Sequence, residues 1–214
     1  MKKMKKIIIA ILIILNLFSV ASGTEAIMLA DDQKAELYNL GIMTGDENGD
    51  LRPADTITRA EAVKMICVAG NIKEQQETAA GFPDVSENHW AYSYICAAKE
   101  HGIVAGDENG YFNPESKVSN EEIIKMIICL LGYDAAAEIQ GGYPSGYIAQ
   151  ASRLGITLGM QLEINTAAIR NDVGLMILNS LDIPLMLKED DFVYVIADGL
   201  NDIPLQTLRN KIGK

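Results

Sequence analysis

The strongest constraint on the fold of this chain is an internal duplication with a spacing of 61 residues. The stretch GIMTGDENGDLRPADTITRAEAVKMI, Gly41 to Ile66, recurs as GIVAGDENGYFNPESKVSNEEIIKMI, Gly102 to Ile127. The glycines and acidic residues of the GDENG loop, the proline that follows it and the Lys-Met-Ile run are identical in register. A shared composition would not place identical residues in register. The sequence therefore predicts a repeat protein.

Each copy has the pattern of one helix ending, a tight loop and a second helix beginning. Glycine brackets the short polar residues of GDENG, which tolerate left-handed conformations, so a compact turn is expected there. Thr58 with Glu61, and Ser119 with Glu122, have the S/T-x-x-E spacing of a capping box. In this motif each side chain satisfies a backbone N–H that the helix leaves unpaired. The second helices should therefore begin just after Thr58 and Ser119.

A third, degenerate copy occupies residues 141–184. Its leading helix is predicted from GGYPSGYIAQASRLGIT, and the shorter segment GMQLEINTAA replaces the GDENG loop. The stretch RNDVGLMI from Arg170 aligns with RAEAVKMI from Arg59, and Ile169 stands in the capping position, so this helix lacks a side-chain cap. The alignment predicts the same buried position on the inward helical stripe for three methionines: Met65, Met126 and Met176.

The N-terminal segment has the pattern of an export signal. Four lysines precede the apolar run Ile7–Phe18, and small residues suitable for cleavage follow it. The run is too short to span a bilayer comfortably, so no membrane span is expected after cleavage. The predicted order is signal peptide 1–23, first copy 26–70, second copy 81–133, third copy 141–184 and C-terminal extension 185–214.

The C-terminal extension departs from the repeat pattern. Phe192–Ile196 is a β-branched and aromatic run that predicts a short strand, and Asp198-Gly199 predicts a turn. Leu205–Lys211 could form two helical turns. The predicted fold class is therefore all-α, mostly helical, with a short β or irregular extension at the C-terminus.

Charge and cysteine content limit the possible partners. The net charge is −11, and removal of the four signal-peptide lysines makes it −15. Nucleic acid is therefore not an expected partner, because its recognition uses basic patches. An anionic polymer would be repelled at long range, so its recognition needs a local positive site. The three cysteines lie in apolar helical runs without CxxC spacing, which predicts buried free thiols.

The chain resembles the S-layer homology family of Gram-positive cell-surface proteins. The residues that carry the resemblance are FPDV, HW, GIVAGDENGYFNP and TRAE, arranged in copies behind a signal peptide. The resemblance implies three copies packed as a pseudo-threefold helical bundle that is exported to the cell wall. It implies noncovalent anchoring to secondary cell-wall polysaccharide, possibly pyruvylated, in grooves between copies. It implies neither a metal, a cofactor nor a catalytic residue.

The resemblance also nominates ligand-binding residues. The arginine of TRAE falls on Arg59 and, in the third copy, on Arg170, whereas Asn120 stands at this position in the second copy. The groove aromatic falls on Trp90 and Tyr143, with Leu29 at the matching position of the first copy. The groove expected to keep both elements pairs Arg59 with Trp90. The loops add four further candidates: Gly45, Asp46, Gly106 and Asp107.

Physical chemistry supports Arg59 and Trp90 independently of the resemblance. A cation in the first turn of a helix opposes the macrodipole, and beside free N–H groups it forms an anion site. A guanidinium can hold a carboxylate through two hydrogen bonds, and an indole offers an apolar face to a sugar. The alternative interpretations are that Arg59 pairs with Asp55 or Glu61 on the surface and that Trp90 belongs to the core.

Three other functions remain open from the sequence. Asp46, Asn48 and Asp50 have the 1, 3, 5 spacing of a calcium loop, but Leu51 and Ile57 stand where glycine and the bidentate glutamate are required. A wall-sugar hydrolase would need a pair of carboxylates, and no spacing nominates one. A degenerate module could instead serve protein–protein assembly. The expectation is that the protein is a binding module and not an enzyme.

Overall fold

The computed structural model describes residues 27–73, 81–190, 193–196 and 206–212. The predicted signal peptide, Phe192 and the Asp198-Gly199 turn lie outside these residues. None of the helices formed by the described residues combines the length and the apolar character needed to cross a membrane.

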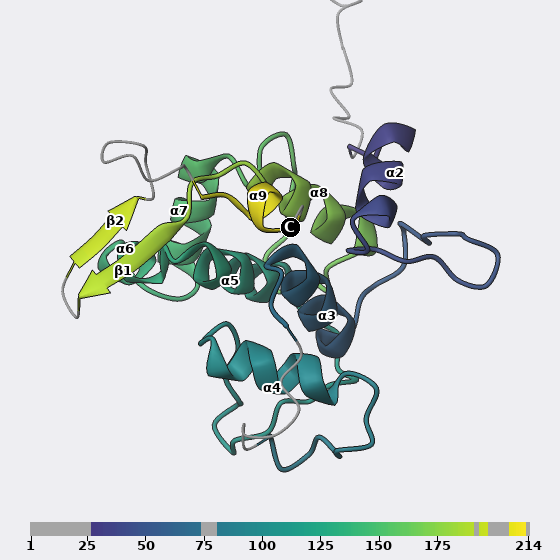
Figure 1. Ribbon diagram of the computed structural model, residues 1–214, viewed down its shortest axis with the longest axis horizontal. Coiled ribbons are helices and arrows are strands. Elements are labelled where there is room, and N and C mark those ends of the chain that lie inside the picture. Colours follow the sequence, from purple (N-terminus) through teal and green to yellow (C-terminus); the bar gives the residue numbers. More distant parts are fainter. Residues whose placement is uncertain (1–26, 74–80, 191–192, 197–205, 213–214) are drawn as a thin grey trace, which may run out of the picture.

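The chain is mostly helical, as predicted, and its described elements include one two-stranded antiparallel sheet (Figure 1). The sheet pairs β1 (Met186–Asp190) with β2 (Val193–Ile196), and the pairing aligns Met186 with Ile196. The elements follow the order α2 Asp31–Asn39, α3 Arg59–Ala69, α4 Tyr92–Glu100, α5 Asn120–Leu131, α6 Asp134–Ile139, α7 Ser145–Leu154, α8 Arg170–Ser180, β1 Met186–Asp190, β2 Val193–Ile196 and α9 Leu208–Ile212.

The second helices of the three copies, α3, α5 and α8, pack against one another at the centre. The leading helices surround them in a cyclic order. Helix α4 of the second copy packs on α3 of the first, α7 of the third copy packs on α5 of the second, and α2 of the first copy packs on α8 of the third (Figure 1). Each leading helix therefore covers the central helix of the preceding copy.

A closed ring of backbone hydrogen bonds joins the segments that precede the central helices. The N–H of Ile57 donates to the carbonyl of Ala168 (3.1 Å), Ala168 donates to Val118 (2.9 Å), and Val118 donates to Ile57 (3.2 Å). All three residues are buried. Each of these residues directly precedes the N-cap of its central helix, so the ring brings the three helix starts together.

A second set of hydrogen bonds runs around the bundle in the opposite direction. The first helical amide of each copy donates to a carbonyl of another copy: Arg59 to Ser116 (3.0 Å), Asn120 to Thr166 (3.2 Å) and Arg170 to Asp55 (2.9 Å). The first copy thus donates to the second, the second to the third, and the third to the first. The third copy takes an equivalent place in this ring although its loop differs in sequence.

The predicted helix caps are present. Thr58 Oγ1 accepts from the amide of Glu61 while Glu61 Oε2 accepts from the amide of Thr58, and Ser119 forms the same capping box with Glu122. Ile169 at the start of α8 provides no side-chain cap, as expected. The prediction of three equivalent buried methionines is also confirmed, because Met65, Met126 and Met176 are all buried.

Two predictions about the remainder of the chain need refinement. The sequence predicted one strand after Pro184, whereas the described residues form two, because the charged run MLKED supplies β1 as a partner for β2. The three cysteines are free thiols, as predicted, but only Cys67 and Cys96 are fully buried and Cys129 is half-buried.

Candidate functional site

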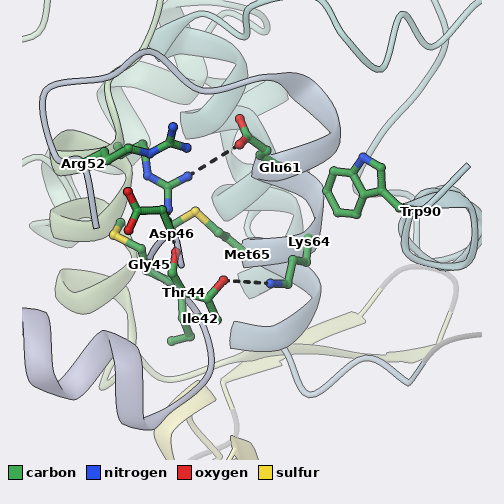
Figure 2. A pocket seen from close by; sticks show the side chains of 11 residues that line it. Ile42, Thr44, Gly45, Asp46, Arg52, Glu61, Lys64, Met65 and Trp90 are labelled. Atoms are coloured by element: carbon green, nitrogen blue, oxygen red, sulfur yellow. Dashed lines mark hydrogen bonds and ion pairs between the residues drawn. The ribbon is translucent and has the colours of Figure 1, made fainter. Parts of the chain in front are cut away.

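Two grooves between copies have equivalent walls. Groove I has a volume of about 250 Å³ and is formed by the first GDENG loop, α3, the segment before α4 and the start of α8 (Figure 2). Figure 2 shows Trp90 on one side of Glu61 and Lys64, with Arg52 and Asp46 on the other. The polar and aromatic residues that line groove I are Thr44, Gly45, Asp46, Arg52, Glu61, Lys64, Trp90 and Arg170.

Groove II has a volume of about 350 Å³ and is built from the corresponding elements one copy further along. It lies between the second GDENG loop, α5, the start of α3 and the segment before α7. The polar and aromatic residues that line groove II are Gly106, Asp107, Tyr111, Phe112, Asn113, Ser116, Lys117, Glu122, Lys125, Tyr143 and Arg59. Each groove thus combines residues from all three copies.

Arg170 forms the inner wall of groove I. Its Nε donates to the carbonyl of Leu51 (2.8 Å), one Nη donates to the carbonyl of Thr44 (3.1 Å), and the other Nη lies 3.7 Å from Glu61 Oε1. Burial lowers the pKa of Arg170 below its ordinary value, and the charge of Glu61 opposes this effect. The guanidinium is therefore held in place by carbonyls of the first copy, and it retains a weakly neutralised positive charge.

Arg59 takes the matching position in groove II. Its Nε donates to the carbonyl of Phe112 (2.9 Å), its Nη1 lies 2.6 Å from Glu122 Oε1, and its guanidinium lies 4.9 Å from the centroid of the Phe112 ring. The Arg59 side chain is only 13% exposed. The alternative interpretation, a surface arginine paired with Asp55 or Glu61, is therefore wrong.

The groove aromatics are exposed at the outer edges. Trp90 is 54% exposed and Tyr143 is 47% exposed, so Trp90 is not a core residue. The ammonium of Lys125 lies 5.3 Å from the centroid of the Tyr143 ring, which keeps the tyrosine close to the cationic wall of groove II. Each groove therefore presents an accessible aromatic face opposite a guanidinium that is buried in groove I and largely buried in groove II.

The structure corrects the pairing expected from the sequence. Arg59 and Trp90 line different grooves, because Arg59 faces Tyr143 across groove II and Arg170 faces Trp90 across groove I. The reason is the cyclic packing of the leading helices. Arg59 of the first copy reaches the loop of the second copy, and the aromatic residue beside this loop, Tyr143, comes from the third copy. In the same way Arg170 of the third copy reaches the loop of the first, and Trp90 comes from the second. Two grooves, not one, retain both an arginine and an aromatic residue.

The GDENG loops owe their shape to the residues nominated from the sequence. A Cβ at Gly45 would lie 2.5 Å from the backbone carbon of Gly49, and one at Gly106 would lie 2.8 Å from that of Gly110. Asp46 Oδ1 accepts from the amides of Asn48 (2.8 Å) and Asp50 (3.1 Å). These carboxylates thus close the turn, which is the role expected for them if they do not bind calcium.

Asp107 holds the second loop in the same manner. Its Oδ1 accepts from the amides of Asn109 (2.9 Å) and Tyr111 (3.0 Å), and its Oδ2 accepts from the Asn113 side chain (3.0 Å). These hydrogen bonds, that from Tyr111 first, lower the pKa of Asp107. The loop backbone is therefore fixed before any ligand arrives.

The third position in the cycle has a different composition. Asn120 stands where the other copies have arginine, and its Nδ2 donates to the carbonyl of Glu163 (3.0 Å) and to Thr166 Oγ1 (3.1 Å). Leu29, at the position of the aromatic, is buried. This third site thus offers neither a guanidinium nor an aromatic face.

Sequence analysis missed two features of the grooves. Lys64 and Lys125 line grooves I and II, and their identity in both copies was a signal that could have nominated them. Glu122 was assigned only as a capping residue and Glu61 as a capping residue or a partner of Arg59, yet each contacts the arginine of the preceding copy. Each groove is lined by three cationic and two acidic side chains, within a chain of net charge −11.

Comparison with known proteins identifies the repeated unit. The family model of the S-layer homology domain matches residues 35–63 and 81–124. A cell surface protein of Thermoanaerobacter kivui is 28% identical over 94% of this chain and 27% of its own length. A middle cell wall protein of Brevibacillus brevis is 30% identical over 89% of this chain and 18% of its own length.

A surface-layer 125 kDa protein of Lysinibacillus sphaericus is 30% identical over 72% of this chain and 12% of its own length. The chain thus spans about a quarter or less of the length of these relatives. The matches agree with the predicted location at the cell wall or cell surface of a Gram-positive bacterium. From these matches and from the repeated grooves we conclude that the chain belongs to the S-layer homology family.

Proposed function

We propose that this chain anchors an exported protein noncovalently to the cell wall by binding secondary cell-wall polysaccharide in grooves I and II. One observation carries the proposal. The same set of groups, a largely buried guanidinium, a rigid GDENG loop and an exposed aromatic ring, occurs twice at equivalent places. These groups suit a sugar that bears an anionic substituent such as a pyruvate ketal.

The chemistry of recognition follows from these groups. An anionic substituent would approach the guanidinium and the lysine of one groove, where charge-assisted hydrogen bonds are stronger than neutral ones. The pyranose ring would lie on the aromatic face of Trp90 or Tyr143, which supplies apolar contact with a polar edge. The surplus of positive side chains in each groove provides the local attraction that the acidic chain as a whole does not.

The carboxylates of the grooves favour binding over hydrolysis. Glu61 accepts from the amide of Thr58 and contacts Arg170, and Glu122 accepts from the amide of Ser119 and contacts Arg59. Asp46 and Asp107 accept hydrogen bonds from the amides of their own loops. A glycosidase needs one carboxyl group free to donate a proton and a second free to attack or to activate water. These four groups instead serve the fold and the arginines.

Co-sedimentation with native cell walls tests the proposal. The parent should sediment with native walls and remain in the supernatant with walls stripped of their secondary polymer. The variant with both Trp90→Ala and Tyr143→Ala should lose most of this binding, because both aromatic faces are removed.

Tyr38→Ala is the matched control, since Tyr38 is 58% exposed and lines neither groove. Release of reducing sugar from purified polymer would point to a hydrolase instead. Equal sedimentation with stripped and native walls would refute recognition of the secondary polymer.

A further inference from the structure

Among the differences between grooves I and II, one concerns a guanidinium group. Arg52 lines groove I, and the residue 61 positions later, Asn113, lines groove II. Groove I therefore has two guanidinium groups, from Arg52 and Arg170. Groove II has one guanidinium, from Arg59, together with the ammonium groups of Lys117 and Lys125. A guanidinium differs from an ammonium because its planar fork holds an oxyanion through two parallel hydrogen bonds.

The backbone at this position does not favour arginine. Arg52 has a φ of 48°, in the left-handed region, and Asn113 and Asn165 each have a φ of 59°. Asparagine tolerates this conformation well, whereas a long side chain rarely adopts it. The conformation is stabilised by backbone groups, since the Arg52 amide donates to Asp50 Oδ1 and its carbonyl accepts from the Asp55 amide. The fold would therefore accept asparagine at residue 52.

The side-chain contacts of Arg52 give little reason for its presence in the fold. Its Nε lies 3.7 Å from Asp55 Oδ2, and both side chains are about half exposed. An ion pair of this length at the surface contributes little to stability. The side chain instead extends along the wall of groove I on the side opposite Trp90 (Figure 2).

Groove I also leaves its guanidinium charges less neutralised than groove II. Arg59 forms a 2.6 Å hydrogen bond with Glu122, whereas Arg170 lies 3.7 Å from Glu61. Burial is the largest cause that lowers the pKa of Arg170, and the positive charge of Arg52 lowers this pKa further. Two like charges side by side with long contacts to carboxylates are unfavourable until an anion lies between or beside them.

We infer that groove I selects a polymer segment that carries two anionic groups, one held by Arg170 and the second by Arg52, while groove II accepts a segment with one. This inference rests on the proposed function and extends it, because it assigns different ligand chemistry to two grooves of one chain. The second anionic group could be a phosphate that links or substitutes the sugars or a further carboxylate. In either case the second group is an oxyanion that can accept two parallel hydrogen bonds from a planar guanidinium.

Trp90 makes groove I observable by itself. It is the single tryptophan of the sequence and is half exposed at the edge of this groove, so its fluorescence reports the occupancy of groove I. Two probes are titrated: a glycoside with one pyruvate ketal, and the same glycoside with an added phosphate monoester. The measured quantity is the ratio of their affinities.

For the parent, the ratio should favour the two-anion probe by about tenfold, the effect of one added charge-assisted contact. Arg52→Asn, which installs the residue of groove II, should bring the ratio close to one. Arg153→Asn makes the same chemical change on the exposed face of α7, outside both grooves, and should leave the ratio as in the parent. Circular dichroism checks the fold of each variant.

The outcomes separate the inference from the proposed function. A parent ratio near one, or an equal fall in the ratio for Arg52→Asn and Arg153→Asn, overturns the inference while polymer-dependent sedimentation sustains the function. If neither probe changes the Trp90 fluorescence of the parent protein, and the parent does not sediment with polymer-bearing walls, the inference and the proposed function are both overturned. In a background with Arg170→Ala, Asn113→Arg should give groove II a preference for the two-anion probe, measured by calorimetry.

Discussion

The guanidinium of Arg59 pairs with Glu122 on α5, at 2.6 Å, and not with Glu61 on its own helix. Glu61 in turn lies 3.7 Å from Arg170 of the third copy. Both contacts join different copies, and both run in the direction in which the first helical amides donate to the neighbouring copy. The candidate site is therefore a property of the assembled bundle, because no copy contains a complete groove by itself.

Arg59→Ala and Arg170→Ala should each weaken wall binding, and the double variant should abolish it. Each single change removes charge-assisted hydrogen bonds worth about 1.5–3 kcal/mol at one groove, and the second groove keeps the protein attached. The measurement is co-sedimentation with polymer-bearing walls over a range of protein concentrations.

The corresponding arginine-to-lysine variants provide the control for charge. They should recover only part of the lost affinity, since a lysine lacks the planar fork. Circular dichroism must confirm the fold, because Arg59→Ala also leaves Glu122 without its closest partner. Full binding by the folded double variant would exclude the arginines from recognition.

Gly45→Ala should distort the first loop and reduce the free energy of unfolding by about 1–3 kcal/mol, as expected for forced overpacking. Its Cβ would lie 2.5 Å from the backbone of Gly49, which cannot move without opening the turn. Gly106→Ala, with 2.8 Å to the corresponding atom, should cost less. Urea unfolding measures both.

Thr44→Ala is the neighbouring control, because alanine occupies this position in the second copy as Ala105. It should leave stability nearly unchanged. Equal stability of the parent and Gly45→Ala would show that the loop relaxes without strain, and the preformed loop would then have no part in the proposed site.

Ile169→Thr should stabilise the fold by about 0.5–1 kcal/mol, the usual effect of adding an N-cap. Ile169 already has the extended backbone of an N-cap residue, with φ −97° and ψ 155°. The amides of Asp172 and Val173 now share its carbonyl, each at 3.1 Å. A threonine hydroxyl would offer Asp172 a second acceptor.

Thr58→Ala provides the reverse comparison and should lose about 1 kcal/mol by removing an existing cap. Both variants are compared by urea denaturation at the same pH. A loss of stability for Ile169→Thr would indicate that the apolar contacts of Ile169 outweigh the missing cap.

The stability of the fold should fall above pH 9 in part because of Cys67. Burial raises the pKa of the Cys67 thiol from 9.0 to about 12. Between these values the unfolded chain releases the proton while the folded chain retains it, so the unfolded state binds fewer protons. The free energy of unfolding therefore decreases with rising pH, by about 1.4 kcal/mol per unit for one such group.

Cys67→Ala isolates this contribution. The difference in unfolding free energy between parent and variant should narrow from pH 8 to pH 10, because only the parent loses stability through this thiol. Val63→Ala, another truncation of a fully buried side chain on α3, should keep a constant difference from the parent. A constant difference for Cys67→Ala as well would contradict the raised pKa.

Local features of the fold could be predicted from the sequence, and the cyclic order could not. Thr58 and Ser119 cap their helices as expected, because a capping box depends on residues only three positions apart. The placement of Arg59 and Tyr143 in one groove depends instead on the direction in which three copies close into a ring. Two directions are compatible with the same local pattern, and the sequence pairing of Arg59 with Trp90 assumed the wrong neighbour.

The cyclic packing changes how sequence divergence in such a chain is interpreted. Asn120 of the second copy, the altered loop of the third and Leu29 of the first all belong to one and the same position of the cycle. The third copy meanwhile contributes Arg170 to groove I and Tyr143 to groove II. Divergence is thus concentrated in one position of the cycle, whose parts are scattered over the whole sequence. A segment that looks degenerate when read linearly still supplies a residue to each of the two grooves, so its removal would leave both grooves incomplete.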